Sequence, residues 1–172
     1  NIKREIRESK AACISFDIFD TLVVRPFYDP SDIFMLLNPT AQELMGTFFS
    51  FDQIRREGEM LAREYYGTKY GWEDITLREI YSFISEHYGI ERETADRIKE
   101  LEEELEIRFC SVRRSGRELL DFSQAVGKRV ILISDMYLEE ETIRKILTKC
   151  GITGYEKIFI SCKYRKLKYD GG

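Results

Sequence analysis

The sequence has few of the residues that build metal sites, with one histidine and four cysteines that show no Cys-x-x-Cys spacing. A zinc site is disfavoured, because its ligands are usually grouped cysteines and histidines. The cysteines have apolar neighbours, which predicts buried reduced thiols and favours a cytoplasmic protein. They are Cys13, Cys110, Cys150 and Cys162.

Long apolar runs and an excess of positive charge are also missing. No segment approaches the ~20 apolar residues of a membrane-spanning helix, so we expect no membrane partner. The formal net charge of -4 provides no general attraction for nucleic acid, whose protein partners usually present a basic face. With 172 residues, 43% of them hydrophobic and only 3 prolines, the chain can form one globular domain or a small core with an insertion.

Three compact apolar segments predict buried β-strands, at residues 13–19, 130–134 and 157–161. A helix is predicted between the second and third strands, because Glu139, Glu140 and Glu141 suit its N-terminal end and Gly151 suits its C-terminal end. A strand, a helix and a strand in this order are typical of a parallel sheet. The fold class is therefore α/β, with a Rossmann-like parallel sheet.

Residues 26–112 have a different pattern. Three amphipathic stripes predict helices there, Thr76 and Glu79 form a capping box before the second of them, and no strand is expected. The acidic stretch 100–106 is interpreted as a solvated helix face. We therefore predict a core formed by residues 1–25 and 113–172, and a helical insertion at 26–112.

Each predicted strand ends in a polar group. Asp17 follows the first apolar run, Ser134 ends the second, and a basic segment with Lys166 and Lys168 follows the third. Because parallel strands bring their carboxyl ends to one edge of the sheet, these groups are expected to share a crevice. A carboxylate, a hydroxyl and an ammonium group in one crevice suit a negatively charged substrate.

These segments resemble the haloacid dehalogenase superfamily of hydrolases. The first motif is Asp17-Ile18-Phe19-Asp20-Thr21-Leu22, the second ends at Ser134, and the third is the basic segment that precedes Gly171. The sequence Phe-Asp-Ile-Phe-Asp-Thr resembles that of a bacterial subgroup of predicted hydrolases, some of which are associated with glycosyltransferases. In this family the insertion would be a cap domain.

The resemblance implies a hydrolase that works through an aspartyl-enzyme intermediate. Asp17 would be the nucleophile, Ser134 the oxyanion donor and Lys168 the charge stabiliser, with Lys166 as a rival for the lysine role. We expect a magnesium-dependent phosphatase acting on a small phosphorylated substrate. Asp17 and the Phe19 carbonyl would bind the Mg²⁺.

The sequence departs from the phosphatase pattern in two ways. Phe19 occupies the position of the second aspartate that serves as general acid and base, and Asp20, one residue later, is the candidate replacement. An aromatic residue there is typical of the dehalogenase branch, so a metal-independent dehalogenase-like hydrolase is an alternative. The fourth, acidic motif has no counterpart, which implies a truncated core that binds Mg²⁺ weakly. A weakened domain that binds a phosphorylated sugar or a partner glycosyltransferase is a further alternative.

Overall fold

Three short apolar strands form the parallel sheet that the sequence predicts. The computed structural model describes residues 2–170, and its sheet has the order β1-β4-β5, with both pairs parallel. The strands are β1 (Cys13–Phe16), β4 (Arg129–Ser134) and β5 (Lys157–Ile160). β4 lies in the centre, as expected for a strand with four consecutive apolar residues, Val130 to Ile133.

The described part of the sheet region also contains five short or medium helices. They are α1 (Ile2–Glu8), α6 (Arg114–Ala125), α7 (Glu140–Lys149), α8 (Ser161–Tyr164) and the 3₁₀ helix η2 (Lys168–Asp170). The buried side chains of β4 alternate with half-exposed ones, because successive residues of a strand point to opposite faces. On the buried face, α6 and α7 cover the sheet and contribute apolar residues to the core. The α/β fold class is thereby confirmed.

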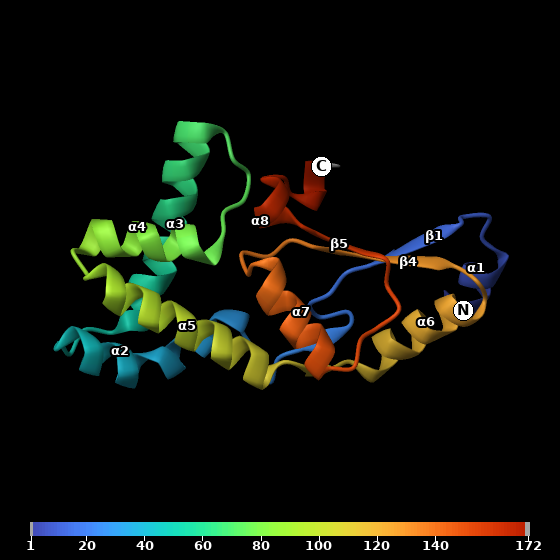
Figure 1. The fold of residues 1–172 in the computed structure, drawn as a ribbon, viewed down its shortest axis with the longest axis horizontal. Coiled ribbons are helices and arrows are strands. Elements are labelled where there is room, and N and C mark those ends of the chain that lie inside the picture. The colour runs from blue at the N-terminus through green and yellow to red at the C-terminus, as the bar shows by residue number, and fades with distance from the viewer. Residues whose placement is uncertain (1, 171–172) are drawn as a thin grey trace.

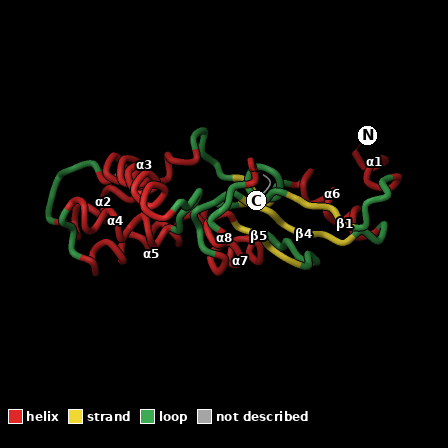
Figure 2. The backbone as a smooth tube through the Cα atoms, turned by 90° about the horizontal axis from the view of Figure 1, so that it is seen from above, coloured by secondary structure: helices red, strands yellow, loops and turns green. Residues whose placement is uncertain are grey.

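A helical insertion separates β1 from β4. It contains η1 (Pro30–Leu37), α2 (Asn38–Met45), α3 (Phe51–Tyr70), α4 (Leu77–Tyr88) and α5 (Arg92–Phe109). The predicted capping box starts α4: the Thr76 side chain accepts from the Glu79 amide, while the Glu79 carboxylate accepts from the Thr76 amide. Figures 1 and 2 show these helices grouped at one end of the molecule, beyond the carboxyl ends of the sheet strands.

The expectation that residues 26–112 contain no strand is wrong at the end of this range. β3 (Ser111–Val112) pairs antiparallel with β2 (Val23–Val24), so the insertion leaves and returns to the core through one small ladder. The first predicted strand is also too long. β1 ends at Phe16, and Phe19 forms an isolated bridge with Val23 because the chain turns back there.

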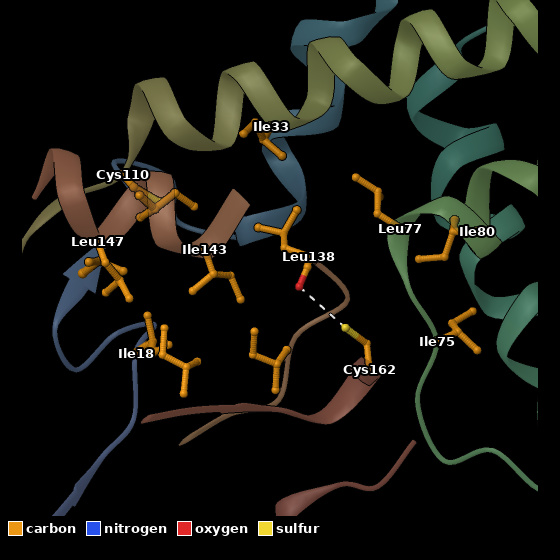
Figure 3. Close-up of a cluster of buried hydrophobic side chains, with 14 of the residues drawn as sticks. Ile18, Ile33, Ile75, Leu77, Ile80, Cys110, Leu138, Ile143, Leu147 and Cys162 are labelled. Atoms are coloured by element: carbon orange, nitrogen blue, oxygen red, sulfur yellow. Dashed lines mark hydrogen bonds between the residues drawn. The ribbon is translucent and has the colours of Figure 1, made fainter. Parts of the chain in front are cut away.

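One hydrophobic core runs through both parts. Figure 3 shows Ile18, Ile143 and Leu147 on the sheet side in the same cluster as Ile33, Ile75 and Leu77 of the insertion. Leu138 lies between the two groups, and its carbonyl accepts a hydrogen bond from the Cys162 thiol. The insertion therefore packs on the carboxyl edge of the sheet through continuous apolar contact.

No described helix is long and apolar enough to cross a membrane. The four cysteines are free thiols. Cys110 and Cys162 are buried as predicted, whereas Cys13 and Cys150 are only half-buried.

Candidate active site

Asp17 and Lys168 meet at the carboxyl edge of the sheet. Asp17 follows β1 directly, and Lys168 begins η2 after β5. The Lys168 Nζ atom donates to Asp17 Oδ1 at 2.9 Å, and the two side chains are about 40% exposed. A half-exposed carboxylate beside an ammonium group can be reached by a small anionic substrate.

Ser134 ends β4 beside this pair. Its Oγ is buried and has no hydrogen-bond partner among the described residues. A buried hydroxyl without a partner costs free energy, and such a group often indicates a place where a ligand binds. The Ser134 hydroxyl can therefore donate to an oxygen atom brought in by a substrate.

Asp135 fixes the backbone from which Lys168 extends. Its carboxylate accepts from the Lys168 amide, with N to O distances of 3.1 and 3.3 Å. Ser134, Asp135, Lys166 and Lys168 line one cavity of about 500 Å³. Its other walls come from β4, β5 and α8: Ile131, Ile133, Phe159, Ile160, Ser161 and Tyr164.

Asp20 occupies a turn in the loop after β1. Its φ is 58°, in the left-handed region that few non-glycine residues adopt. The Asp20 amide donates to the Val23 carbonyl at 2.8 Å, and its own carbonyl accepts from the Arg113 side chain. The backbone of Asp20 thus closes the turn, and its side chain is exposed.

The described residues do not by themselves fit a magnesium ion. Among them, no group of three or more histidine, cysteine, aspartate or glutamate side chains is placed to hold a metal. Asp17 and the Phe19 carbonyl give two oxygen donors, whereas Mg²⁺ requires near-octahedral coordination. The Lys168 ammonium already binds the Asp17 carboxylate, which disfavours a cation further.

Lys166 does not take part in the pair that Lys168 makes with Asp17. Its ammonium contacts the Glu73 carboxylate, in the loop between α3 and α4. Glu73 lies in the insertion, and no local pattern around it predicts a contact with the third motif. Gly171, the last residue of that motif, lies outside the described residues, as does Gly172 of the predicted core.

Arg25 lies close to the first motif. Its guanidinium stacks on the Phe19 ring at 4.5 Å, and its Nε lies 2.9 Å from Glu106 Oε2. The Glu106 side chain is completely buried, and its second oxygen has no hydrogen-bond partner among the described residues. Burial, partly opposed by Arg25, raises the pKa of Glu106 to about 7.

A second buried ion pair lies one turn earlier on α5. Arg55 is fully buried and binds Glu102 through Nε and Nη2, at 2.7 and 2.8 Å. It also contacts Glu59 at 2.8 Å, and Tyr81 donates to Glu102 at 2.7 Å. The interpretation of 100–106 as a solvated face is therefore wrong at Glu102 and Glu106, which pair with the buried Arg55 and the half-buried Arg25.

The described aromatic residues at the end of α3 stack on one another. Tyr66 and Trp72 are parallel at 5.6 Å, and Tyr70 stacks on Trp72 at 4.8 Å. The Arg165 guanidinium lies 4.0 Å from the centre of the Trp72 ring. This cluster therefore contacts the chain that follows β5.

Comparison with known proteins identifies the fold. No protein-family model and no curated protein match the sequence. Among solved structures, the chain is similar to a dehalogenase, with a TM-score of 0.51 and 16% identity over 95% of this chain and 67% of that one. The L-2-haloacid dehalogenase of Xanthobacter autotrophicus with chloropropionic acid covalently bound has a TM-score of 0.49 and 10% identity, over 92% and 60%.

The chain therefore has a fold similar to that of the first of these structures, a dehalogenase. This chain spans about two thirds of the length of the first of these structures and less of the second. At these identities the likeness concerns the arrangement of the chain, so the function is argued from the residues of the site.

Proposed function

We propose that this chain carries the nucleophile of a hydrolase of the haloacid dehalogenase type, acting on a small anionic substrate. The observation that carries the proposal is the contact between Lys168 and Asp17 at the carboxyl edge of the sheet. The unpartnered Ser134 hydroxyl, in a cavity that Lys168 also lines, supports it. We also propose that the chain belongs to the bacterial subgroup of predicted hydrolases named above and that its partner is a glycosyltransferase.

Each residue has a distinct role in this reaction. An Asp17 oxygen attacks the substrate and bonds to it covalently, while the bond to the leaving group breaks and its electrons depart with that group. The product is an aspartyl phosphate when the attacked atom is phosphorus and an aspartyl ester when it is carbon. The Lys168 ammonium offsets the repulsion between two anions, and the Ser134 hydroxyl donates to a substrate oxygen. Water then cleaves the covalent intermediate and regenerates Asp17, and one of its protons neutralises an alkoxide leaving group.

A phosphate ester is the first candidate substrate, because an ammonium and a hydroxyl donor both suit a phosphoryl dianion. A phosphatase of this type would use magnesium, with Asp17 and the Phe19 carbonyl among the ligands. Since the described residues do not complete such a site, no step above depends on it. The Asp20 carboxylate is the candidate general acid.

A metal-independent dehalogenase-like hydrolase is the second candidate. Phe19 favours it, because this residue leaves the position of the usual acid and base without a carboxylate. A carbon-halogen bond needs no protonation when it breaks, since halide is a stable leaving group. The same attack by Asp17 would then form an aspartyl ester to carbon.

We also propose that the insertion acts as a cap. Its helices lie beyond the carboxyl ends of the strands (Figure 1), where a mobile cover could exclude water and admit substrate. Pocket shape under a cap would select the substrate.

Replacing Asp17 tests the proposal. Asp17→Asn should lower turnover by about 10³-fold or more, because an amide is not a nucleophile toward these substrates. The complete protein would be assayed on phosphate esters and on 2-halo acids, each with and without Mg²⁺. Asp121→Asn, an exposed change on α6, is the matched control and should retain full turnover.

The pattern of activity separates the candidates. Turnover of esters only with Mg²⁺ supports the phosphatase, and turnover of halo acids without it supports the dehalogenase. Undiminished turnover in Asp17→Asn would rule out the aspartyl-enzyme mechanism. Binding of a phosphorylated sugar without any turnover would favour the weakened binding domain.

A further inference from the structure

The segment that carries Lys168 is held by the insertion as well as by the core. This segment, Ser161 to Lys168, which we call the lysine segment, comprises α8, a turn at Arg165 and the start of η2. Arg165 has a φ of 61°, a left-handed conformation that is unfavourable for a residue with a side chain. Such a turn needs contacts that stabilise it.

Three acidic residues of the insertion bind three different parts of the lysine segment. Asp74 accepts from the Ser161 hydroxyl, and Glu79 binds Arg165 through two contacts of 2.6 Å. Glu73 accepts from the Lys166 ammonium and, at 3.0 Å, from the Leu167 amide. The Glu73 amide also donates to the Arg165 carbonyl at 3.2 Å.

Glu73 has the most direct connection to the site. It binds both residues that precede Lys168, and the Asp135 carboxylate binds the Lys168 amide from the other side. Hydrogen bonds from Lys166 hold the pKa of the Glu73 carboxyl below its usual value, so it is ionised at neutral pH. The backbone of Lys168 therefore lies between one carboxylate of the insertion and one of the core.

We propose that Glu73 is a positioning residue, through which the insertion sets the place of the Lys168 ammonium against Asp17. When the α3–α4 loop is seated on the lysine segment, Lys168 reaches the nucleophile. When this anchor is lost, the ammonium is released from Asp17. A role of this coupling in catalysis rests on the hydrolase proposed above. The effect of Glu73 on the position of Lys168 is independent of that proposal.

Chemical labelling tests the coupling without any substrate. Trace acetic anhydride acylates accessible amines, and mass spectrometry compares Lys168 with Lys157 of β5 in the same molecule. In Glu73→Gln, Lys168 should react roughly two- to fivefold faster relative to Lys157, as expected when an exposed ion pair is lost. Lys168 does not itself contact Glu73 in the described structure, so its change reports positioning.

Two further variants serve as control and rescue. Glu64→Gln removes the same charge from an exposed site on α3 and should leave the labelling ratio of Lys168 unchanged. Exchanging the charges in Glu73→Lys with Lys166→Glu should restore part of the slow labelling, because the ion pair returns whereas the acceptor for the Leu167 amide does not. If Glu73→Gln does not fold, Lys166→Met breaks the same contact and should give the same increase.

Kinetics add a second readout on the complete protein. Glu73→Gln should lower kcat roughly tenfold with KM changed less than about threefold, because a small displacement of a catalytic group slows the chemical step. An unchanged labelling ratio in both Glu73→Gln and Lys166→Met overturns the positioning role, even if turnover shows that the hydrolase is real. If Lys168 is labelled faster in Glu73→Gln but neither the parent protein nor any variant shows turnover, the positioning role of Glu73 stands and the proposed hydrolase is rejected.

Discussion

Glu106 is a buried carboxylic acid, whereas the sequence predicts a solvent-exposed side chain at this position. Its side chain faces Arg25 from the insertion's first connection, Cys110 from the end of α5, and the Arg55–Glu102 pair one turn away. Burial and the neighbouring Glu102 favour the protonated form, whereas Arg25 and Arg55 favour the charged form. The balance raises the pKa of Glu106 to about 7, so its charge changes near neutral pH.

Stability should therefore fall as Glu106 ionises. Between its ordinary value of 4.5 and about 7, the folded state keeps a proton that the unfolded chain releases, so the free energy of unfolding decreases as pH rises. The change is on the order of 3 kcal/mol. Glu106→Gln should lack this component, and urea unfolding of both proteins at pH 5 and pH 8 would measure the difference.

Glu104→Gln is the control for this comparison, because Glu104 is an exposed acid on the same helix. Its stability should follow that of the parent protein at both pH values. If Glu106→Gln also ran parallel to the parent, Glu106 would have an ordinary pKa despite its burial.

At the scale of elements, α6 approaches the loop after β1 unusually closely. A Cβ atom added to Gly116 would lie 1.8 Å from the Thr21 carbonyl oxygen and 2.8 Å from its carbon. These are backbone atoms of the loop that contains Asp17 and Asp20, so they cannot move as a side chain can. Gly116 therefore sets the distance between a helix and the candidate nucleophile loop.

Gly116→Ala should destabilise the protein by about 1–3 kcal/mol, the usual cost of overpacking, and should reduce any Asp17-dependent turnover. Thermal unfolding would measure the first effect. Gly67→Ala in α3 provides the comparison, because its Cβ would lie 3.4 Å from the nearest atom. That variant should be neutral or slightly stabilised, since alanine favours a helix by up to ~1 kcal/mol over glycine. Equal stability of the two variants would show that the loop adapts freely.

Much of the element pattern could be predicted from local sequence. The three sheet strands, the stripes of α3 to α5 and the cap of α4 are periodic or have clear end signals. The β2/β3 ladder could not be predicted, because two residues per strand carry no period. The apolar run predicts a strand that ends at Ser161, but Ser161 begins α8, where polar contacts with Asp74 and Met136 hold it.

The site was predictable only where it lies next to a strand. Asp17 and Ser134 follow apolar runs directly, so the topology of a parallel sheet brings them to one edge. Glu73 and Glu106 lie in segments that look solvent-exposed, and only tertiary contacts with Lys166 and Arg25 give them a role. Charged residues of this kind carry no local signal, because their partners are distant in sequence.

The molecule as a whole is joined by charges as well as by apolar contact. Arg55 lies under the rings of Phe34 and Tyr137, at 4.4 and 5.0 Å from their centres. Phe34 belongs to the insertion, whereas Tyr137 follows β4 of the core. A fully buried arginine thus stands at the junction of the two parts.

Arg55→Met should destabilise the protein by about 3–5 kcal/mol, because it leaves Glu102 buried without its charged partner. Far-UV circular dichroism and the fluorescence of the single tryptophan, Trp72, should shift together in urea, since one core unfolds as a unit. Adding Glu102→Gln should recover part of the loss, because the orphaned charge is removed.

The neighbouring residue supplies the control. Arg56 is partly exposed and lies 3.7 Å from Asp32, so Arg56→Met should cost no more than about 1 kcal/mol. A cost for Arg55→Met no greater than that for Arg56→Met would mean that Arg55 does not stabilise the junction of the two parts.

The β2/β3 ladder also bears on the order in which the chain folds. Cys13 of β1 pairs with Arg129 of β4, so during synthesis the first strand emerges long before its partner exists. Closing so long a loop in one step has an entropic cost that slows folding. Once the insertion has folded, pairing of Val23 with Val112 brings its two ends together, and the distant strands become neighbours across a short connection. The insertion, which separates β1 from β4 in the sequence, thereby brings these two strands together as the chain folds.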